Sequence, residues 1–312
     1  MNFPFKLRST SEFDVVGFGT NAVDYLIRLP DYPQFNSKVE FTSQSMQAGG
    51  EVASTLVGLQ RLGLRTAYAG RFGSDANGKI GMQSLIDEGV DTRFTETVED
   101  AETQVAFVII DEGSGERTIL WKRDERLGFS KDEAPLAAAS LGKILHLTPH
   151  DTDAAIIIAA EAKKDGIVVT IDIDNIFDNV DNLLPLVDVV IASSDLPKKM
   201  TGLDDERASI NKLAETFGCA LVGVTLGTRG SLFIADGEFI ETPAFAVPGG
   251  CIDTTGAGDA FRTGFLFGML VGETIEKAAV YANAVAALKC RAIGARTALP
   301  TKPELEEFIA NT

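Results

Sequence analysis

The most informative segment of the chain reads Asp253-Thr254-Thr255-Gly256-Ala257-Gly258-Asp259-Ala260-Phe261. It places two carboxylates on either side of a Gly-Ala-Gly turn. Residues 260–271 are nearly all apolar or small, which predicts a buried helix. A glycine turn that enters a helix leaves backbone N–H groups unpaired and pointing in one direction, and these groups and the helix dipole both favour an anion.

Asp259 falls in the first turn of this predicted helix, beside the anion. A carboxylate there can accept the proton of an attacking hydroxyl group. The N–H groups of Gly256, Ala257 and Gly258 can hold the charge that develops on a transferring phosphoryl group. From the residues alone, the plain alternative of a glycine-rich turn before a core helix, with the acidic residues as helix caps, stays open.

Composition limits the other function classes. The chain has 312 residues, 45% of them hydrophobic, which suffices for a large core. The net charge of −17 opposes binding to nucleic acid or to an anionic membrane surface, although a local ATP site is compatible with it. No apolar run is long enough to span a membrane and the N-terminus lacks a signal-peptide core, so we expect a cytoplasmic protein. The three cysteines form no CxxC motif and are expected to be reduced.

Continuous apolar runs of strand length alternate with helical patterns along most of the chain. This alternation predicts a parallel sheet covered on both faces, with ligands beyond the carboxyl ends of its strands. The predicted strands are 13–19, 65–73, 142–148, 167–173, 187–193 and 220–227, and the predicted helices include 54–64, 77–88, 153–166 and 206–218.

Two segments, about 36–48 and 103–123, instead alternate apolar and polar residues. They predict antiparallel strands with one solvated face, and the second contains a hairpin turn at 112–116. There is no internal repeat and no obvious linker. We therefore expect one domain over residues 1–312 that carries a small β lid.

The segment from Asp253 to Phe261 resembles the C-terminal signature of the ribokinase/PfkB family of sugar and nucleoside kinases. Residues 49–78, with Gly49-Gly50 and Gly70-Arg71, resemble its N-terminal signature, and the resemblance extends from Asp14 to Pro300. It implies a ribokinase-like three-layer α/β/α sandwich with a mostly parallel central sheet and a β lid. It also implies ATP and Mg²⁺ as cofactors, and a homodimer formed through the lid.

The resemblance assigns site residues by position. The sugar site would include Asp24, Gly49, Gly50 and Ser54. The nucleotide site would include Thr225, Gly227, Gly230, Asn283 and Gly294. A monovalent cation such as K⁺ would be held by the Asp253 carboxylate and by backbone carbonyls of Thr255, Lys289, Ala292 and Gly294.

Three departures from the family pattern change these expectations. Ser54 stands where the family commonly has Asn, so the sugar contact is expected to differ. The family's Asn-x-x-Glu motif is missing at 193–196, so its Mg²⁺ role is lost, moved to Asp195, or supplied by Asp172 or Asp174. Ala298 replaces a hydroxyl residue near the cation, which puts K⁺ activation in doubt.

Two glycine-rich segments imitate other nucleotide sites. Residues 73–80 nearly match a P-loop, but Ile80 stands where that motif needs Ser or Thr. Residues 17–22 imitate a dinucleotide fingerprint, but the segment that follows is predicted as extended chain rather than a helix. A nicotinamide oxidoreductase is therefore disfavoured.

We expect transfer of the ATP γ-phosphoryl group to a primary hydroxyl of a sugar. Residues 286–296 are similar to ketose-type kinases such as sulfofructose kinase, which favours a ketose or an acidic sugar, and Arg123 is a candidate to bind a charged substrate group. A nucleoside kinase is an alternative, although no cluster of aromatic residues in the sequence marks a platform for a base. A non-catalytic sugar-binding module on the same fold is a second alternative.

Overall fold

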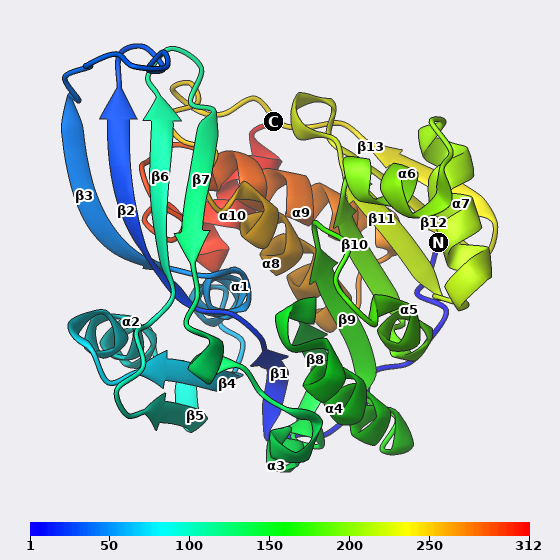
Figure 1. The fold of residues 1–312 in the computed structure, drawn as a ribbon. Helices are drawn as coiled ribbons and strands as arrows, with labels where there is room; N and C mark the ends of the chain where they lie inside the picture. Colours follow the sequence, from blue (N-terminus) through cyan, green and yellow to red (C-terminus); the bar gives the residue numbers. More distant parts are fainter.

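The computed structural model describes residues 1–312 and contains two sheets (Figure 1). The main sheet has nine strands in the order β13-β12-β11-β10-β9-β8-β1-β4-β5, and all neighbours are parallel except those of β12 and β13. Its strands are β1 (Phe13–Phe18), β4 (Thr66–Gly73), β5 (Asp91–Val98), β8 (Gly142–Leu147), β9 (Val168–Ile173), β10 (Val189–Ser193), β11 (Leu221–Thr225), β12 (Ser231–Ala235) and β13 (Glu238–Thr242).

Helices cover both faces of the main sheet, as the alternating pattern predicted (Figure 1). One face carries α1 (Glu51–Arg61), α8 (Ala257–Leu270), α9 (Ile275–Lys289) and α10 (Lys302–Ala310). The other carries α3 (Leu136–Ala139), α4 (Thr152–Lys164), α5 (Val180–Leu183), α6 (Asp195–Thr201) and α7 (Glu206–Phe217). The three-layer sandwich is thus confirmed.

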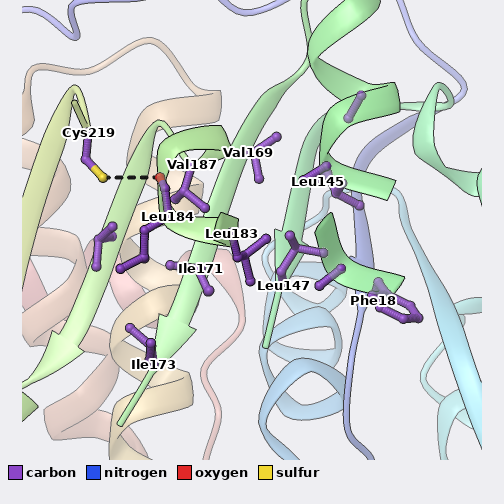
Figure 2. Packing of buried hydrophobic residues seen from close by; sticks show 14 of the residues in the cluster. Phe18, Leu145, Leu147, Val169, Ile171, Ile173, Leu183, Leu184, Val187 and Cys219 are labelled. Atoms are coloured by element: carbon purple, nitrogen blue, oxygen red, sulfur yellow. Dashed lines mark hydrogen bonds between the residues drawn. The ribbon is translucent and has the colours of Figure 1, made fainter. Parts of the chain in front are cut away.

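The core is divided between these two faces because neighbouring strand residues point to opposite sides of a sheet. Val15 packs under α1 and α8, whereas its neighbour Val16 belongs to the cluster on the opposite face. Figure 2 shows part of this second cluster, which includes Ile171 and Val187; the Cys219 thiol there donates to the carbonyl of Leu184 at 3.5 Å. Burial of apolar surface on both faces is the main stabilising contribution to such a sandwich.

The lid is a separate four-stranded sheet in the order β3-β2-β6-β7, at one side of the main sheet (Figure 1). Its strands are β2 (Ala22–Leu29), β3 (Ser43–Gly49), β6 (Val105–Asp111) and β7 (Arg117–Lys122). The predicted hairpin turn at 112–116 joins β6 to β7. β2, predicted as extended chain, is a strand of this sheet that pairs with β3 antiparallel and with β6 in parallel.

The glycine-rich segment 73–80 serves the fold. Asp75 caps α2 (Ala76–Asp87) by accepting from the Gly78 N–H at 2.9 Å. A Cβ at Gly78 would lie 1.9 Å from the carbonyl oxygen of Gly73, so the turn excludes a side chain there. Residues 17–22 lead into strand β2, not into a helix, which agrees with the rejection of a dinucleotide fingerprint. No helix in the structure has the length and apolar character that crossing a membrane requires.

Candidate active site

A cavity of about 780 Å³ lies between the carboxyl ends of the main-sheet strands, the lid and the start of α8. The strands β1, β8, β9, β10 and β11 each bring residues to its wall at or just after their ends, as expected for a parallel sheet. These residues are Thr20, His150, Asp174, Ser193 and Thr225. The lid contributes the inward side chains of β6 and β7, among them Arg117 and Trp121.

The turn before α8 is the most complete anion site in this cavity. Gly256 has a φ of 74°, which glycine adopts without strain, and α8 begins at Ala257. The Ala257 N–H donates to the carbonyl of Thr254 at 3.1 Å, whereas the N–H groups of Gly256 and Gly258 have no carbonyl partner. The Thr255 hydroxyl lines the cavity, is buried and also lacks a partner. The arrangement fits a phosphate group.

Asp259 is the third residue of α8 and lines the cavity beside this turn. Burial raises the pKa of its carboxyl group above the usual range, and the nearby Asp172 carboxylate raises it further. Arg262, one turn later on α8, acts on the same pKa in the opposite direction. The surroundings therefore increase the affinity of the Asp259 carboxylate for a proton, as a general base requires.

Arg262 brings a buried positive charge against the anion turn. Its guanidinium forms an ion pair with Asp172 at 2.5 Å and donates to the carbonyl of Ile191 at 2.9 Å. A Cβ added to Gly258 would lie 2.5 Å from Nη1 of this arginine, so the glycine allows the close approach. Arg262 therefore lies in the cavity wall, next to the anion turn.

The lid supplies the other end of the cavity. Asp24 on β2 lies opposite Gln47 on β3, and a Cβ at the adjacent Gly49 would lie 2.1 Å from its Oδ2. Burial, with a smaller effect from Asp253, raises the pKa of Asp24 to about 6. Gly50, at a φ of 90°, precedes α1 and lines the cavity. Asp24, Gly49 and Gly50, which the resemblance assigned to the sugar site, therefore lie close together at the lid end of the cavity.

Glu51 is a cavity residue that the sequence analysis missed. Its carboxylate accepts from the Thr20 hydroxyl at 3.0 Å and lies 3.6 Å from Nδ1 of His150. Burial, followed by the charges of Asp174 and Asp259, raises the pKa of Glu51 to about 8. The signal that could have found it is an acidic residue directly after Gly49-Gly50, at the start of a helix that faces the site.

Three aromatic rings also gather in the cavity wall, contrary to the expectation from sequence. The ring of His150 lies 6.1 Å from that of Trp121 and 4.9 Å from that of Phe177, between ring centroids. They come from β7, from the segment after β8 and from the segment after β9. Because they are distant in sequence, only the fold brings them together.

Three predicted substrate residues, Gly49, Ser54 and Arg123, lie outside the cavity lining, and so does Arg296. Arg123 donates to both carboxylate oxygens of Asp151, at 2.8 and 2.7 Å, so its guanidinium is already paired within the chain. Ser54 is buried and accepts from Nε of Arg296 at 3.1 Å. Arg296 also donates to the carbonyl of Gly49, so this pair supports the backbone at the sugar end.

The predicted nucleotide residues divide between the cavity wall and its support. Thr225, Gly227, Gly230 and Asn283 line the cavity. The Asn283 amide donates to the hydroxyl of Ser231 at 3.0 Å, which fixes its orientation. Gly294 does not line the cavity, although its neighbour Ala295 does.

The carboxylates available to Mg²⁺ are few. Asp195 is exposed and lies outside the cavity lining, and Asp172 is occupied by Arg262. Asp174 is exposed, lines the cavity and forms no ion pair, so its carboxylate is free to contact a cation. No group of three or more His, Cys, Asp or Glu side chains could hold a metal, so nucleotide phosphates and water must supply most ligands.

The predicted K⁺ site does not fit a free cation. Lys289 and Asp253 have no exposed surface, and Nζ of Lys289 lies 2.7 Å from the Asp253 carbonyl oxygen and 3.9 Å from its Oδ2. The Asp253 carboxylate also accepts the N–H groups of Thr255 and Gly294. The half-buried Ala292 forms no polar contact with it. The ammonium group lies beside the carboxylate assigned to K⁺, and a second positive charge there would be repelled.

Comparison with known proteins identifies the family. The model of the pfkB family carbohydrate kinases matches residues 14–302. The chain belongs to this family. It is 28% identical over 301 residues to a ribokinase of Haemophilus influenzae (93% of this chain, 96% of the relative). It is 31% identical over 286 residues to a fructokinase of Klebsiella pneumoniae (84% and 91%).

The fold is likewise that of solved family members. The crystal structure of a putative ribokinase from Agrobacterium tumefaciens superposes with a TM-score of 0.88 at 25% identity, covering 96% of this chain and 98% of that one. The ribokinase-like fold and a phosphotransferase activity toward an alcohol group are therefore established for this chain. Membership also defines the substrate as a sugar or a nucleoside.

Proposed function

We propose that this kinase transfers the γ-phosphoryl group of ATP to a primary hydroxyl of a neutral sugar, with Asp259 as the general base. The bond between the sugar oxygen and the γ-phosphorus forms, the bond from that phosphorus to the bridging oxygen of ADP breaks, and the hydroxyl proton passes to Asp259. The proposal rests on the N–H groups of Gly256 and Gly258, which have no hydrogen-bond acceptor in the chain and lie beside this carboxylate.

Charge in the cavity supports this mechanism. The N–H groups and Arg262 face the same point, where negative charge accumulates on the transferring group. Asp174 would hold Mg²⁺, which when bound neutralises phosphate charge. Arg117 on the lid donates to the Thr254 hydroxyl at 3.1 Å, and Thr254 donates to the Gly115 carbonyl, so the lid tip contacts the anion turn.

The sugar end favours a neutral polyol. Asp24 and Glu51 bring carboxyl groups that can hydrogen-bond to sugar hydroxyls, and the ionised Asp24 would repel an acidic substrate. Arg123, the cation expected to bind an acidic group, is paired with Asp151. We therefore retain the ketose expected from sequence and no longer favour the acidic sugar.

A nucleoside is the second candidate, because of the rings of Trp121, His150 and Phe177. Aromatic side chains of this kind can stack on a nucleobase while Asp24 binds ribose hydroxyls.

We also propose that the enzyme is a homodimer whose subunits pair through the outer face of the lid. Tyr25 and Phe107 stack on that face with ring centroids 5.2 Å apart. Met46, Phe107 and Leu120 are each about half exposed there, and apolar groups gathered on one sheet face are typical of an interface.

The decisive experiment measures ADP release from Mg·ATP across neutral sugars, sugar acids and nucleosides, for the wild type and for Asp259→Asn. We expect turnover on one class and a loss of about a hundredfold to ten-thousandfold in the variant. Asp178→Asn, an exposed aspartate outside the cavity lining, is the matched control and should keep full activity.

Each other outcome has a definite meaning. Equal turnover in Asp259→Asn would show that the base lies elsewhere. Sugar binding by the wild type with no turnover on any compound would favour the non-catalytic module.

A further inference from the structure

Lys289 is the last residue of α9 and one of the largest side chains with no exposed surface. A buried lysine is rare unless its charge is compensated, because removing an ammonium group from water is costly. The ammonium of Lys289 has one direct hydrogen bond, to the carbonyl oxygen of Asp253, and one carboxylate in reach, that of Asp253 itself. Its position at the carboxyl end of α9 is also favourable, because that end of the helix dipole attracts a cation.

Asp253 joins three segments of the active-site wall. Its Oδ1 accepts the N–H of Thr255, at the start of the anion turn, at 2.8 Å. Its Oδ2 accepts the N–H of Gly294, in the segment that follows α9, at 2.7 Å. Its carbonyl accepts from Lys289. A displacement of Asp253 would therefore move the turn that begins two residues later.

We propose, on the basis of the proposed kinase function, that the Lys289 ammonium is a tethered cation that positions the anion turn and makes a free monovalent cation unnecessary. The cation acts through Asp253, so Lys289 is a positioning residue; it does not line the cavity that would hold the substrates. The charge is covalently part of the chain, and its local concentration does not depend on salt. Wild-type activity should then be the same in potassium, sodium and choline chloride at equal ionic strength.

The test compares two substitutions that remove the charge in different ways. Lys289→Ala removes the side chain and leaves room for a small cation beside Asp253, whereas Lys289→Met fills the space with an uncharged chain of similar length. We expect both to lose at least about tenfold in kcat/KM for ATP in choline chloride, equivalent to about 1.4 kcal/mol. Potassium or ammonium should restore Lys289→Ala and leave Lys289→Met unchanged.

A second measurement needs no catalysis. We expect potassium to raise the thermal midpoint of Lys289→Ala relative to choline at equal ionic strength, because a ligand that binds only the folded state stabilises it. The wild type and Lys289→Met should show no such difference. Lys277→Ala, an exposed lysine on the same helix, is the control for loss of a lysine charge from α9.

The outcomes separate this proposal from the proposed function. No turnover by the wild type in any salt would contradict the kinase assignment, while the thermal measurement would still test the cation. Wild-type activity that requires potassium would overturn the tethered cation without a folded variant being needed. Full activity of Lys289→Ala in choline, or a folded Lys289→Ala that no small cation restores, would overturn it as well.

Discussion

Folding places Asp24, Glu51 and Asp259 in one cavity where each carboxyl group has a raised pKa. The main physical cause is the same in each case, because burial disfavours the ionised form. Such groups reduce the stability of the folded protein at neutral pH. Buried carboxyl groups with raised pKa values are therefore typical of binding and catalytic sites.

Glu51→Gln should therefore stabilise the protein in a pH-dependent way. The pKa of Glu51 is raised from 4.5 to about 8, so between these values the unfolded chain has lost a proton that the folded chain keeps. The stability of the wild type accordingly falls as pH rises through this window. We expect the thermal midpoint of Glu51→Gln to match the wild type near pH 4.5 and to exceed it by about 2 °C or more above pH 8, by scanning calorimetry.

The exposed Glu307 on α10 provides the control, since Glu307→Gln should show no such divergence. A constant difference between Glu51→Gln and the wild type across the whole pH range would show that burial of this carboxylate is not responsible.

At the level of single residues, the sequence predicted a local turn but did not predict side-chain contacts between residues that are distant in sequence. The anion turn after Asp253 is formed by neighbouring residues, and the helix predicted to follow it is present as α8. Arg123 and Ser54 were assigned by position, but their partners, Asp151 and Arg296, lie far away in sequence. The side chain of Lys289 was missed for the same reason, because its partner Asp253 is 36 residues distant.

At the level of elements, the close contact of α8 with α9 holds together the two helices that carry Asp259 and Lys289. Gly264 and Gly268 on α8 face this contact. A Cβ at Gly264 would lie 2.4 Å from the carbonyl oxygen of Tyr281, and one at Gly268 would lie 2.6 Å from Cα of Ala278. Both obstacles are backbone atoms, so the helices could accept a methyl group only by moving apart.

Gly268→Ala should consequently destabilise the protein. Overpacking of this kind costs about 1–3 kcal/mol, against a gain of up to about 1 kcal/mol from the higher helix propensity of alanine. We expect a net loss in the free energy of unfolding in urea, together with a lower kcat. Lys277→Ala on the exposed side of α9 should stay within about 0.5 kcal/mol of the wild type. A Gly268→Ala protein as stable as the wild type would mean that the helices adjust without strain.

Sequence patterns located most elements because buried parallel strands are continuous apolar runs. The predicted strand 187–193 corresponds to β10 (Val189–Ser193), and the predicted helix 206–218 to α7 (Glu206–Phe217). The patterns predicted β2 only as extended chain, because its pairing with β3 and β6 is set by the fold of the lid.

At the scale of the whole molecule, the lid has two faces with different tasks. Alternate residues of β6 and β7, such as Val108 and Trp121, face the cavity, while Phe107 and Leu120 point the other way. A sheet with one solvated face normally presents polar residues there. Apolar side chains on the outer face therefore indicate that a second surface covers it, and the same face of a second copy provides an isologous match.

Leu120→Asp should accordingly convert a dimer into monomers in sedimentation velocity at micromolar concentration. Leu120 is 56% exposed in the single chain, so the substitution should leave the fold and its thermal midpoint nearly unchanged, while an aspartate in each copy of a dimer would be buried and repelled by its neighbour. Leu136→Asp is the matched control, because this leucine on α3 is also exposed but lies away from the lid. A wild type that sediments as a monomer, or a Leu120→Asp protein that remains a dimer, would exclude pairing through this face. Retention of turnover by the monomeric variant would further show that each cavity is complete within one chain.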